Sequence, residues 1–180
     1  LATGANGQRQ AMFLENVPGF AGRILRNFDI GDEDSALIIS SSGTSVVPVE
    51  MAEELQEKGV TVVGMVSQKH SDASEAKRED GKKLGDFSDM ILDTGAPVGD
   101  AAVQVSGLTE KVAPLSTLGG VILVNTIKAE VAERLVEGGA PPSVLAAACT
   151  AGVARSTELF EAAYDAVSYT HLRAHETFAN

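Results

Sequence analysis

Short apolar runs alternate with longer amphipathic stretches along most of the chain. Continuous apolar runs, which are typical of strands buried on both faces of a sheet, occur at residues 36–39, 60–66 and 90–92. A further short run at residues 101–105 predicts a fourth strand. Clusters of Gly, Asp and Ser separate several of these runs from the next stretch, as expected for chain reversals at the surface.

Between the apolar runs, hydrophobic residues recur with helical spacing. Three of them follow one another at intervals of four within residues 46–58, which predicts a helix that ends at Gly59. The longest helical pattern, residues 116–137, is followed by a Gly-Gly pair and then by two prolines. Residues 11–28 also form a loosely helical pattern, which an internal Pro-Gly pair would kink or split. Strands alternating with helices predict an α/β fold, with an open parallel sheet flanked by helices.

Length and charge narrow the classes of protein that fit. A chain of 180 residues can bury roughly 70% of its unfolded surface in one domain. The formal charge of -11 and the aromatic share of 4% argue against a nucleic-acid partner, because a polyanion is repelled and few rings can stack on bases. The lone Cys149, which we expect to be a small buried residue, cannot form an internal disulfide and indicates a reducing compartment. No apolar stretch reaches the ~18 residues of a spanning helix and no signal peptide is recognisable, so we expect a cytoplasmic protein without a membrane segment.

A cluster of hydroxyl side chains follows the first predicted strand and precedes a helix. At this point of a parallel sheet, the carboxyl end of the strand opens onto the ligand crevice, and the next helix presents unpaired N–H groups. Gly43 lets the backbone turn closely around an anion, while the neighbouring hydroxyls can donate to its oxygens. The cluster predicts a phosphate-binding loop, although the same residue types are common in turns and helix caps. Its members are Ser40, Ser41, Ser42, Gly43, Thr44 and Ser45.

Ser116 and Thr117 form a second hydroxyl pair at the start of the longest predicted helix. Either residue can be a simple N-cap, but two hydroxyl-bearing helix starts at one edge of a sheet make a better pocket for a phosphate and a polyol than either alone. Neither site has the Gly-Lys-Ser/Thr ending of a nucleotide-triphosphate loop or the G-x-G-x-x-G spacing. His171 and His175 do not make a zinc site of the zincin kind, because Glu176 follows the second His instead of the first and no third ligand is present in the pattern. We therefore expect neither a nucleotide cofactor nor a metal ion.

Taken together, these segments resemble the SIS (sugar isomerase) domain. The resemblance rests on residues 38–45, on a second strand that ends at Ser67, and on residues 114–119 ahead of an apolar helix. It covers most of residues 11–145. Three further segments are similar to stand-alone bacterial SIS proteins of uncharacterised function. They are residues 67–71, 81–84 and 99–101.

The resemblance implies a flavodoxin-like three-layer sandwich around a five-stranded parallel sheet that binds phosphosugars and pairs into a homodimer. Residues 1–167 then form an N-terminally truncated SIS domain that lacks its first strand, because the first apolar run begins only at residue 36. Residues 168–180 resemble a translated sequencing adapter, and we interpret them as a non-native tail. The phosphate loop of the family corresponds here to the hydroxyls of Ser40, Ser42 and Ser45 with the backbone of Ser41 and Gly43, and its later Ser-Thr pair to Ser116 and Thr117.

Domains of this family commonly isomerise sugar phosphates, which requires a base and a group that opens the sugar ring. Glu110, shortly before the second hydroxyl pair, is the candidate base, and His70, just past the second strand, is the candidate for ring opening. The plain alternatives are that Glu110 is a solvated turn residue and that His70 is an exposed loop residue. The sequence thus predicts a metal-independent aldose–ketose isomerase, with a non-catalytic module that senses a phosphosugar as the alternative. The apolar face of the longest helix predicts dimerisation through that helix.

Overall fold

The computed structural model describes residues 7–176, apart from the side chains of Gln8 and of residues 166–176. Residues 1–6 and the last four residues of the expected tail, 177–180, lie outside the described part. The chain divides into two compact units, Leu1–Thr126 and Ile127–Asn180, which we treat separately. In chain order, the elements of the first unit are α1 (Gly7–Leu14), α2 (Phe20–Leu25), β1 (Ser35–Ile39), α3 (Val46–Glu57), β2 (Thr61–Val66), α4 (Gln68–Asp72), the 3₁₀ turn η2 (Leu84–Phe87), β3 (Met90–Asp93), β4 (Ala101–Val103), β5 (Val112–Pro114) and the first turns of α5 (Ser116–Glu137).

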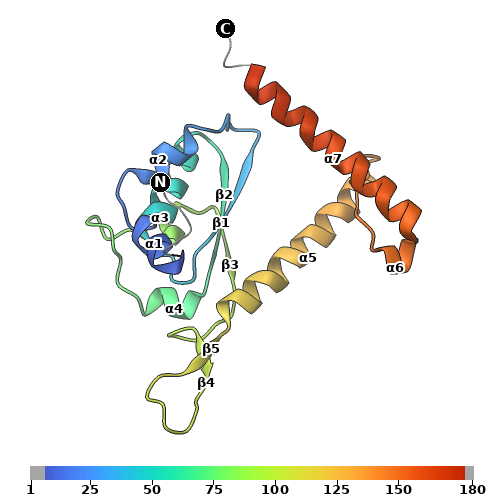
Figure 1. Ribbon diagram of the computed structural model, residues 1–180. Helices are drawn as coiled ribbons and strands as arrows, with labels where there is room; N and C mark the ends of the chain where they lie inside the picture. The colour runs from blue at the N-terminus through green and yellow to red at the C-terminus, as the bar shows by residue number, and fades with distance from the viewer. Residues whose placement is uncertain (1–6, 177–180) are drawn as a thin grey trace. The chain divides into compact units, whose positions relative to one another are not determined.

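Three parallel strands form the central sheet, in the order β1-β2-β3 (Figure 1). In their register, Ile38 lies beside Gly64, and Gly64 lies beside Ile91. The ladder continues beyond β1, because the amide of Ser40 donates to the carbonyl of Met65 at 3.0 Å. The mixed α/β architecture with a parallel sheet confirms the fold class expected from the alternating pattern.

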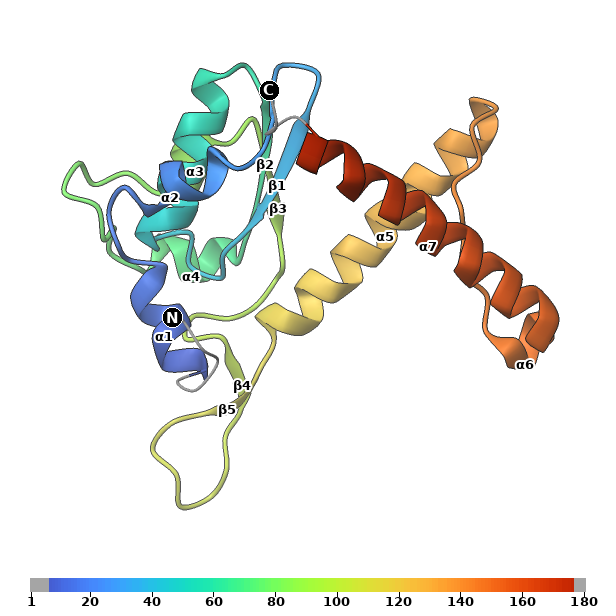
Figure 2. The ribbon, with the colours of Figure 1, turned by 45° about the horizontal axis from the view of Figure 1, so that its top comes forward.

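One face of this sheet packs against α3 and holds the main hydrophobic core (Figure 2). The strands direct every second side chain to this face, and α3 meets them with apolar residues at intervals of three. Helix α2 contacts α3, and the Glu50 carboxylate accepts two hydrogen bonds from the amide of Gly19, at 2.9 and 3.0 Å. The buried cluster consists of Leu25, Ile38, Val49, Ala52, Leu55, Val60, Val62, Val66 and Leu84.

The opposite face of the sheet meets the first turns of α5 near the carboxyl ends of the strands. Met65, whose side chain alternates to this face, is fully buried, and a Cβ on Gly120 of α5 would lie 3.8 Å from its sulfur atom. Away from this contact the same face is open, since Leu37 and Ile39 are 41% and 55% exposed. Helices therefore lie on both faces of the sheet, which is the layering of an α/β sandwich.

The expected fourth strand differs from the prediction in its pairing. β4 ends at Val103 and pairs antiparallel with β5, so that Ala101 lies opposite Pro114 and Val103 opposite Val112. The parallel sheet in the described part of the chain therefore has three strands, and β4 belongs to a separate two-stranded ribbon. Only residues 94–100 separate β3 from β4, which is too short for the crossover of about a dozen residues that a parallel pair needs, whereas an antiparallel hairpin with β5 needs no crossover.

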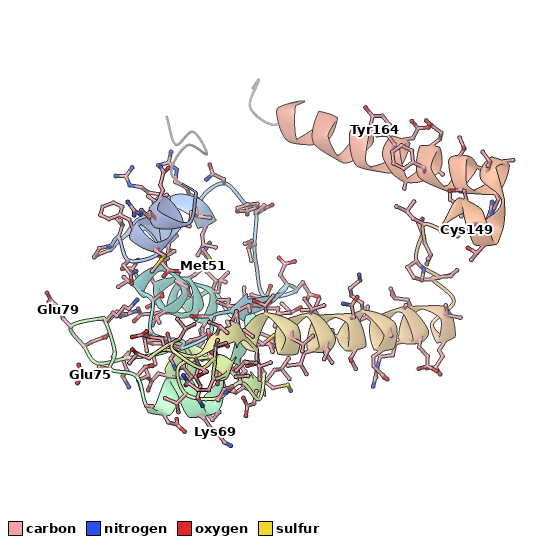
Figure 3. The ribbon with its side chains drawn as sticks, turned by 60° about the horizontal axis from the view of Figure 1, so that its bottom comes forward. Met51, Lys69, Glu75, Glu79, Cys149 and Tyr164 are labelled. Atoms are coloured by element: carbon pink, nitrogen blue, oxygen red, sulfur yellow. The ribbon has the colours of Figure 1, made fainter. Side chains whose placement is uncertain are left out.

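The second unit contains the remainder of α5, the short α6 (Ala148–Ala151) and the long α7 (Val153–Glu176). On α7, the rings of Phe160 and Tyr164 stack with centroids 6.5 Å apart. Cys149 on α6 is exposed, so the expectation that it would be buried is wrong (Figure 3). Its Ala-rich surroundings form only a short helix, which has no buried residues. Among residues 7–176, no helix combines the length and the hydrophobicity needed to cross a bilayer.

Candidate functional site

Hydroxyl-bearing residues follow each of the three parallel strands at the same edge of the sheet. Ser40 and Ser41 come directly after β1, Ser67 directly after β2, and Thr94 directly after β3. Backbone hydrogen bonds hold them in place, because Ser67 N donates to Ser41 O at 2.9 Å and Thr94 N donates to Val66 O at 2.8 Å. The carboxyl ends of parallel strands are where open α/β sheets bind ligands.

The loop after β1 uses most of its hydroxyls to stabilise its own turn. The amide of Gly43 donates to Ser40 Oγ at 3.2 Å and the amide of Thr44 donates to Ser42 Oγ at 3.3 Å. Ser42 Oγ and Thr44 Oγ1 share a further hydrogen bond of 2.8 Å, while Thr44 and Ser45 are only 2% and 6% exposed. A ligand that binds these amides must therefore compete with the loop's own hydroxyls.

The N-terminus of α3, which follows this loop, is also largely occupied. The amide of Val47 donates to the carbonyl of Glu15 at 2.9 Å, and Pro48 has no N–H. Ser45 stands at the N-cap, and its side chain makes no capping hydrogen bond. Of the loop hydroxyls, it is Ser41 that faces a cavity.

That cavity has a volume of about 390 Å³ and lies within the first unit, at the carboxyl edge of the sheet. Its size is in the range of sites for small molecules. Polar side chains reach it from three separate segments: the loop after β1, the residue after β3, and the start of α5. The lining consists of Ile39, Ser41, Met65, Thr94, Ser116, Thr117, Gly120, Val121, Val124 and Asn125.

Two of the hydroxyl groups around this cavity have no hydrogen-bond partner in the protein. Ser41 Oγ and Thr94 Oγ1 are both buried atoms that make no hydrogen bond. A buried polar atom without a partner costs roughly 1–3 kcal/mol, so native structures rarely keep one without a ligand or a water molecule to satisfy it. Both hydroxyls have an unused proton, but their oxygen atoms are covered in this structure, so they can donate to a bound molecule only after the side chains turn toward the cavity.

Asp100 holds the start of α5 at the cavity. Its carboxylate accepts hydrogen bonds from Ser116 N at 2.6 Å, from Leu115 N at 3.1 Å and from Ser116 Oγ at 2.6 Å. Partial burial acts to raise the pKa of Asp100, but these hydrogen bonds outweigh it and hold the pKa below the ordinary value of an aspartate. Asp100 is therefore ionised at neutral pH and neutralises the positive end of the α5 dipole.

The close approach of α5 to the sheet depends on Gly119. A Cβ at this position would overlap the carbonyl oxygen of Thr94 and would lie 3.0 Å from Thr94 Cβ. The absence of a side chain lets the helix start beside the end of β3, and this brings Ser116 and Thr117 to the same cavity as Ser41. Residues more than seventy positions apart in the chain thus line one site.

The two candidate acid-base residues lie outside the cavity lining. His70, on α4, is half-buried, and its Nδ1 accepts a hydrogen bond of 3.1 Å from the amide of Gly99. Gly99 directly precedes Asp100 in the chain, so this bond holds His70 against the segment that carries Asp100. Glu110 is exposed in the loop that joins β4 and β5. Among the described residues, no three His, Cys, Asp or Glu side chains come together as metal ligands.

Three residues of the site are not singled out by the sequence pattern. Thr94 carries a recognisable signal, because it directly follows a strand just as Ser40 does. Asn125 lies inside a helix and carries no such signal. Asp100 occurs only in one of the segments that resemble the family, and its role depends on hydrogen bonds to residues 15 and 16 positions away.

Comparison with known proteins agrees with the resemblance drawn from the motifs. Residues 1–67, which include β1, its loop, α3 and β2, match the family described as the SIS domain. A UPF0309 protein of Halalkalibacterium halodurans is 36% identical over 135 residues, which are 75% of this chain and 56% of that protein. UPF0309 proteins of Brucella anthropi and Brucella canis are 34% and 35% identical, over 79% and 74% of this chain and 57% and 54% of their own lengths. The chain thus spans little more than half the length of the curated relatives it matches.

Proposed function

Because this chain carries an SIS-domain match and is related to the UPF0309 proteins, we propose that it binds a sugar phosphate in the cavity between the sheet and the start of α5. One observation carries the proposal: hydroxyl groups from three separate segments converge on one cavity, and two of them lack any partner in the protein. Hydroxyl groups suit a sugar, because each can donate to one ligand oxygen and accept from another.

The remaining lining supports the same class of ligand. Met65, Val121 and Val124 give the cavity an apolar side, against which the C–H groups of a sugar ring can pack. No charged residue lines the cavity itself. A phosphate group would be held there by uncharged donors, as neutral hydroxyls and amides can do in a local concave site.

Calorimetric titration with a panel of hexose and amino-sugar phosphates tests this proposal. Ser41→Ala removes one of the unpartnered hydroxyls, and we expect the affinity to fall at least about tenfold if that group donates to a charged phosphate oxygen. Ser35→Ala is the matched control, because Ser35 is exposed at the opposite, amino end of β1. Equal affinities of the two variants for every member of the panel would count against the cavity as the binding site.

The finer proposal is metal-independent isomerisation of the bound sugar phosphate between its aldose and ketose forms. The reaction moves a proton between two adjacent carbons, and His70 and Glu110 are its candidate acid-base groups. Binding without turnover is the second candidate, and the position of Glu110 favours it, since this side chain is exposed and is not part of the cavity lining.

Proton exchange at C2 of the sugar separates these two activities. In D₂O, an isomerase incorporates deuterium at C2, whereas a sensing module only raises its melting temperature in the presence of the sugar phosphate. If Glu110 is the base, Glu110→Gln lowers the exchange rate at least about a hundredfold while the melting shift remains. Exchange at an unchanged rate in that variant would exclude Glu110 as the base.

A further inference from the structure

Asp100 ties the start of α5 to the segment between β3 and β4. Its backbone adopts a left-handed conformation with φ of 66°, which is uncommon for a residue other than glycine. The carbonyl of Asp100 accepts from Leu115 N at 2.9 Å, in addition to the three hydrogen bonds that its carboxylate accepts. One residue thus holds both the backbone and the first side chain of the helix.

The hydrogen bond between Ser116 and Asp100 determines what Ser116 can offer a ligand. A serine hydroxyl has one proton and two lone pairs, and an ionised carboxylate can only accept. The proton of Ser116 Oγ therefore points to Asp100 Oδ2, over a distance of 2.6 Å. Toward the cavity that Ser116 lines, only its lone pairs remain, so it can accept a hydrogen bond there but cannot donate one.

We propose that Asp100 is a positioning residue that makes Ser116 an acceptor for a hydroxyl group of the sugar and prevents Ser116 from donating to the phosphate. The inference rests on the proposed binding of a sugar phosphate. A sugar hydroxyl can donate to the lone pairs of Ser116. Phosphate oxygens need donors, and they would meet both a hydroxyl with no free proton and the negative charge of the carboxylate behind it.

The end of the cavity near the strands offers hydrogen-bond donors, whereas Ser116 offers only an acceptor. Ser41 Oγ and Thr94 Oγ1 have no partner in the protein, so their protons become available to phosphate oxygens once these buried hydroxyls turn toward the cavity. They come from the ends of β1 and β3, while Ser116 comes from the helix. The ligand is then bound in one direction, with its phosphate toward Ser41 and Thr94 and its ring hydroxyls toward Ser116.

Asp100→Asn tests this direction of binding. The substitution reverses the hydrogen bond between residue 100 and Ser116 Oγ but keeps the bonds from the amides of Leu115 and Ser116 to the side chain of residue 100. The amide oxygen of Asn can still accept from Ser116 N and Leu115 N, whereas its NH₂ group donates to Ser116 Oγ and releases the serine proton toward the cavity. We expect inorganic phosphate to bind at least about threefold more tightly to D100N than to the natural chain. We expect glucose 6-phosphate to gain less than inorganic phosphate, because its ring hydroxyl loses the acceptor.

Two alanine variants complete the design. Ser116→Ala should leave the affinity for inorganic phosphate within about twofold of the natural chain and weaken glucose 6-phosphate by about threefold to tenfold. Ser41→Ala should weaken both probes. If D100N and S116A weaken inorganic phosphate as much as S41A does, Ser116 is a phosphate donor and the proposal is wrong. If the natural chain binds neither probe nor any member of the sugar-phosphate panel, the proposed function itself fails.

A measurement without any ligand distinguishes failure of the Asp100 inference from failure of the proposed function. Carbon-detected NMR titration of the Asp100 carboxyl group should show a higher pKa in S116A than in the natural chain, because the variant lacks the hydroxyl that donates to the ionised form. An unchanged pKa would mean that the Ser116–Asp100 hydrogen bond does not form in solution, and this would overturn the inference whatever the binding results. Circular dichroism of each variant checks that the helices are retained.

Discussion

Gly119 is the residue at which α5 comes closest to the end of β3. The space for a Cβ is already filled by the carbonyl group and the side chain of Thr94, both of which belong to the cavity wall. Gly120, the next residue, is different, since a Cβ there would be in ordinary contact with Met65 at 3.8 Å. Two adjacent glycines in one helix thus have unequal tolerance for a methyl group.

This pair provides a matched test of the helix position. Alanine normally stabilises a helix interior by up to about 1 kcal/mol relative to glycine. Gly120→Ala should therefore keep or slightly raise the free energy of unfolding. Gly119→Ala should lower it by about 1–3 kcal/mol, because the added methyl group pushes α5 away from Thr94.

Urea unfolding of both variants measures these differences, and calorimetric titration shows whether binding of the sugar phosphate is lost with Gly119. If both variants have the same stability, α5 does not approach the sheet as closely in solution as in the structure.

At the scale of the secondary-structure elements, carboxylates join segments that the sheet alone does not connect. Asp93, at the end of β3, accepts hydrogen bonds from Gln68 N at 3.0 Å and from Gly95 N at 2.9 Å. The first bond attaches the start of α4 to β3, and the second closes the turn that leads away from Thr94. Asp100 does the same for α5. The starts of α4 and α5 are thus each held by a carboxylate from a neighbouring segment.

The contribution of Asp93 to the stability of the fold should depend on pH. The hydrogen bonds from Gln68 and Gly95 hold the pKa of Asp93 below its ordinary value. A carboxylate with a lowered pKa in the folded state stabilises the fold above its unfolded pKa, about 3.9, and this contribution is lost as the pH falls through the folded value. Water screens the exposed carboxylate, so we expect no more than about 1 kcal/mol.

Asp93→Asn is the variant that measures this effect. At pH 7 its free energy of unfolding in urea should be lower than that of the natural chain by up to about 1 kcal/mol, and near pH 3 the difference should shrink toward zero. A difference that stays constant between the two pH values would show that ionisation of Asp93 does not contribute to the free energy of unfolding.

On the scale of the whole molecule, the exposed apolar surface of the first unit includes parts of α5 and of the open face of the sheet. Leu118 and Ile122 of α5 are 56% and 57% exposed, and the open face of the sheet exposes Leu37 and Ile39. Scattered apolar side chains are normal at a protein surface, but a helix that presents several in a row is a candidate interface. The net charge of -11 opposes association of two copies.

We therefore expect a homodimer through α5 whose stability increases with salt. Light scattering at micromolar concentration should give twice the mass of the chain, and Ile122→Glu should shift the equilibrium to the monomer by at least about tenfold. Lys128→Gln is the matched control, because it lowers the net charge by the same one unit at an exposed position of the same helix that faces another direction than Ile122. A natural chain that is monomeric at high salt would exclude this dimer.

The sequence by itself determined the elements that depend on local pattern. Apolar runs predicted β1, β2 and β3, and helical spacing predicted α3 and the full extent of α5, because burial on one side or both sides of an element leaves a periodic trace in the residues of that element. The hydroxyl clusters after β1 and before α5 were visible for the same reason. The family resemblance followed from these local motifs, and the match of residues 1–67 to the SIS domain agrees with it.

Only the tertiary structure decided which of these hydroxyls meet. Ser41, Thr94 and Ser116 share a cavity because β1 and β3 end at one edge of the sheet and because Gly119 lets α5 lie against Thr94. The partner of β4 and the direction of the Ser116 proton were equally hidden, since both depend on residues at least nine positions away along the chain. Contacts between distant segments leave no periodic pattern in one sequence, and so the chemistry of this site became visible only in three dimensions.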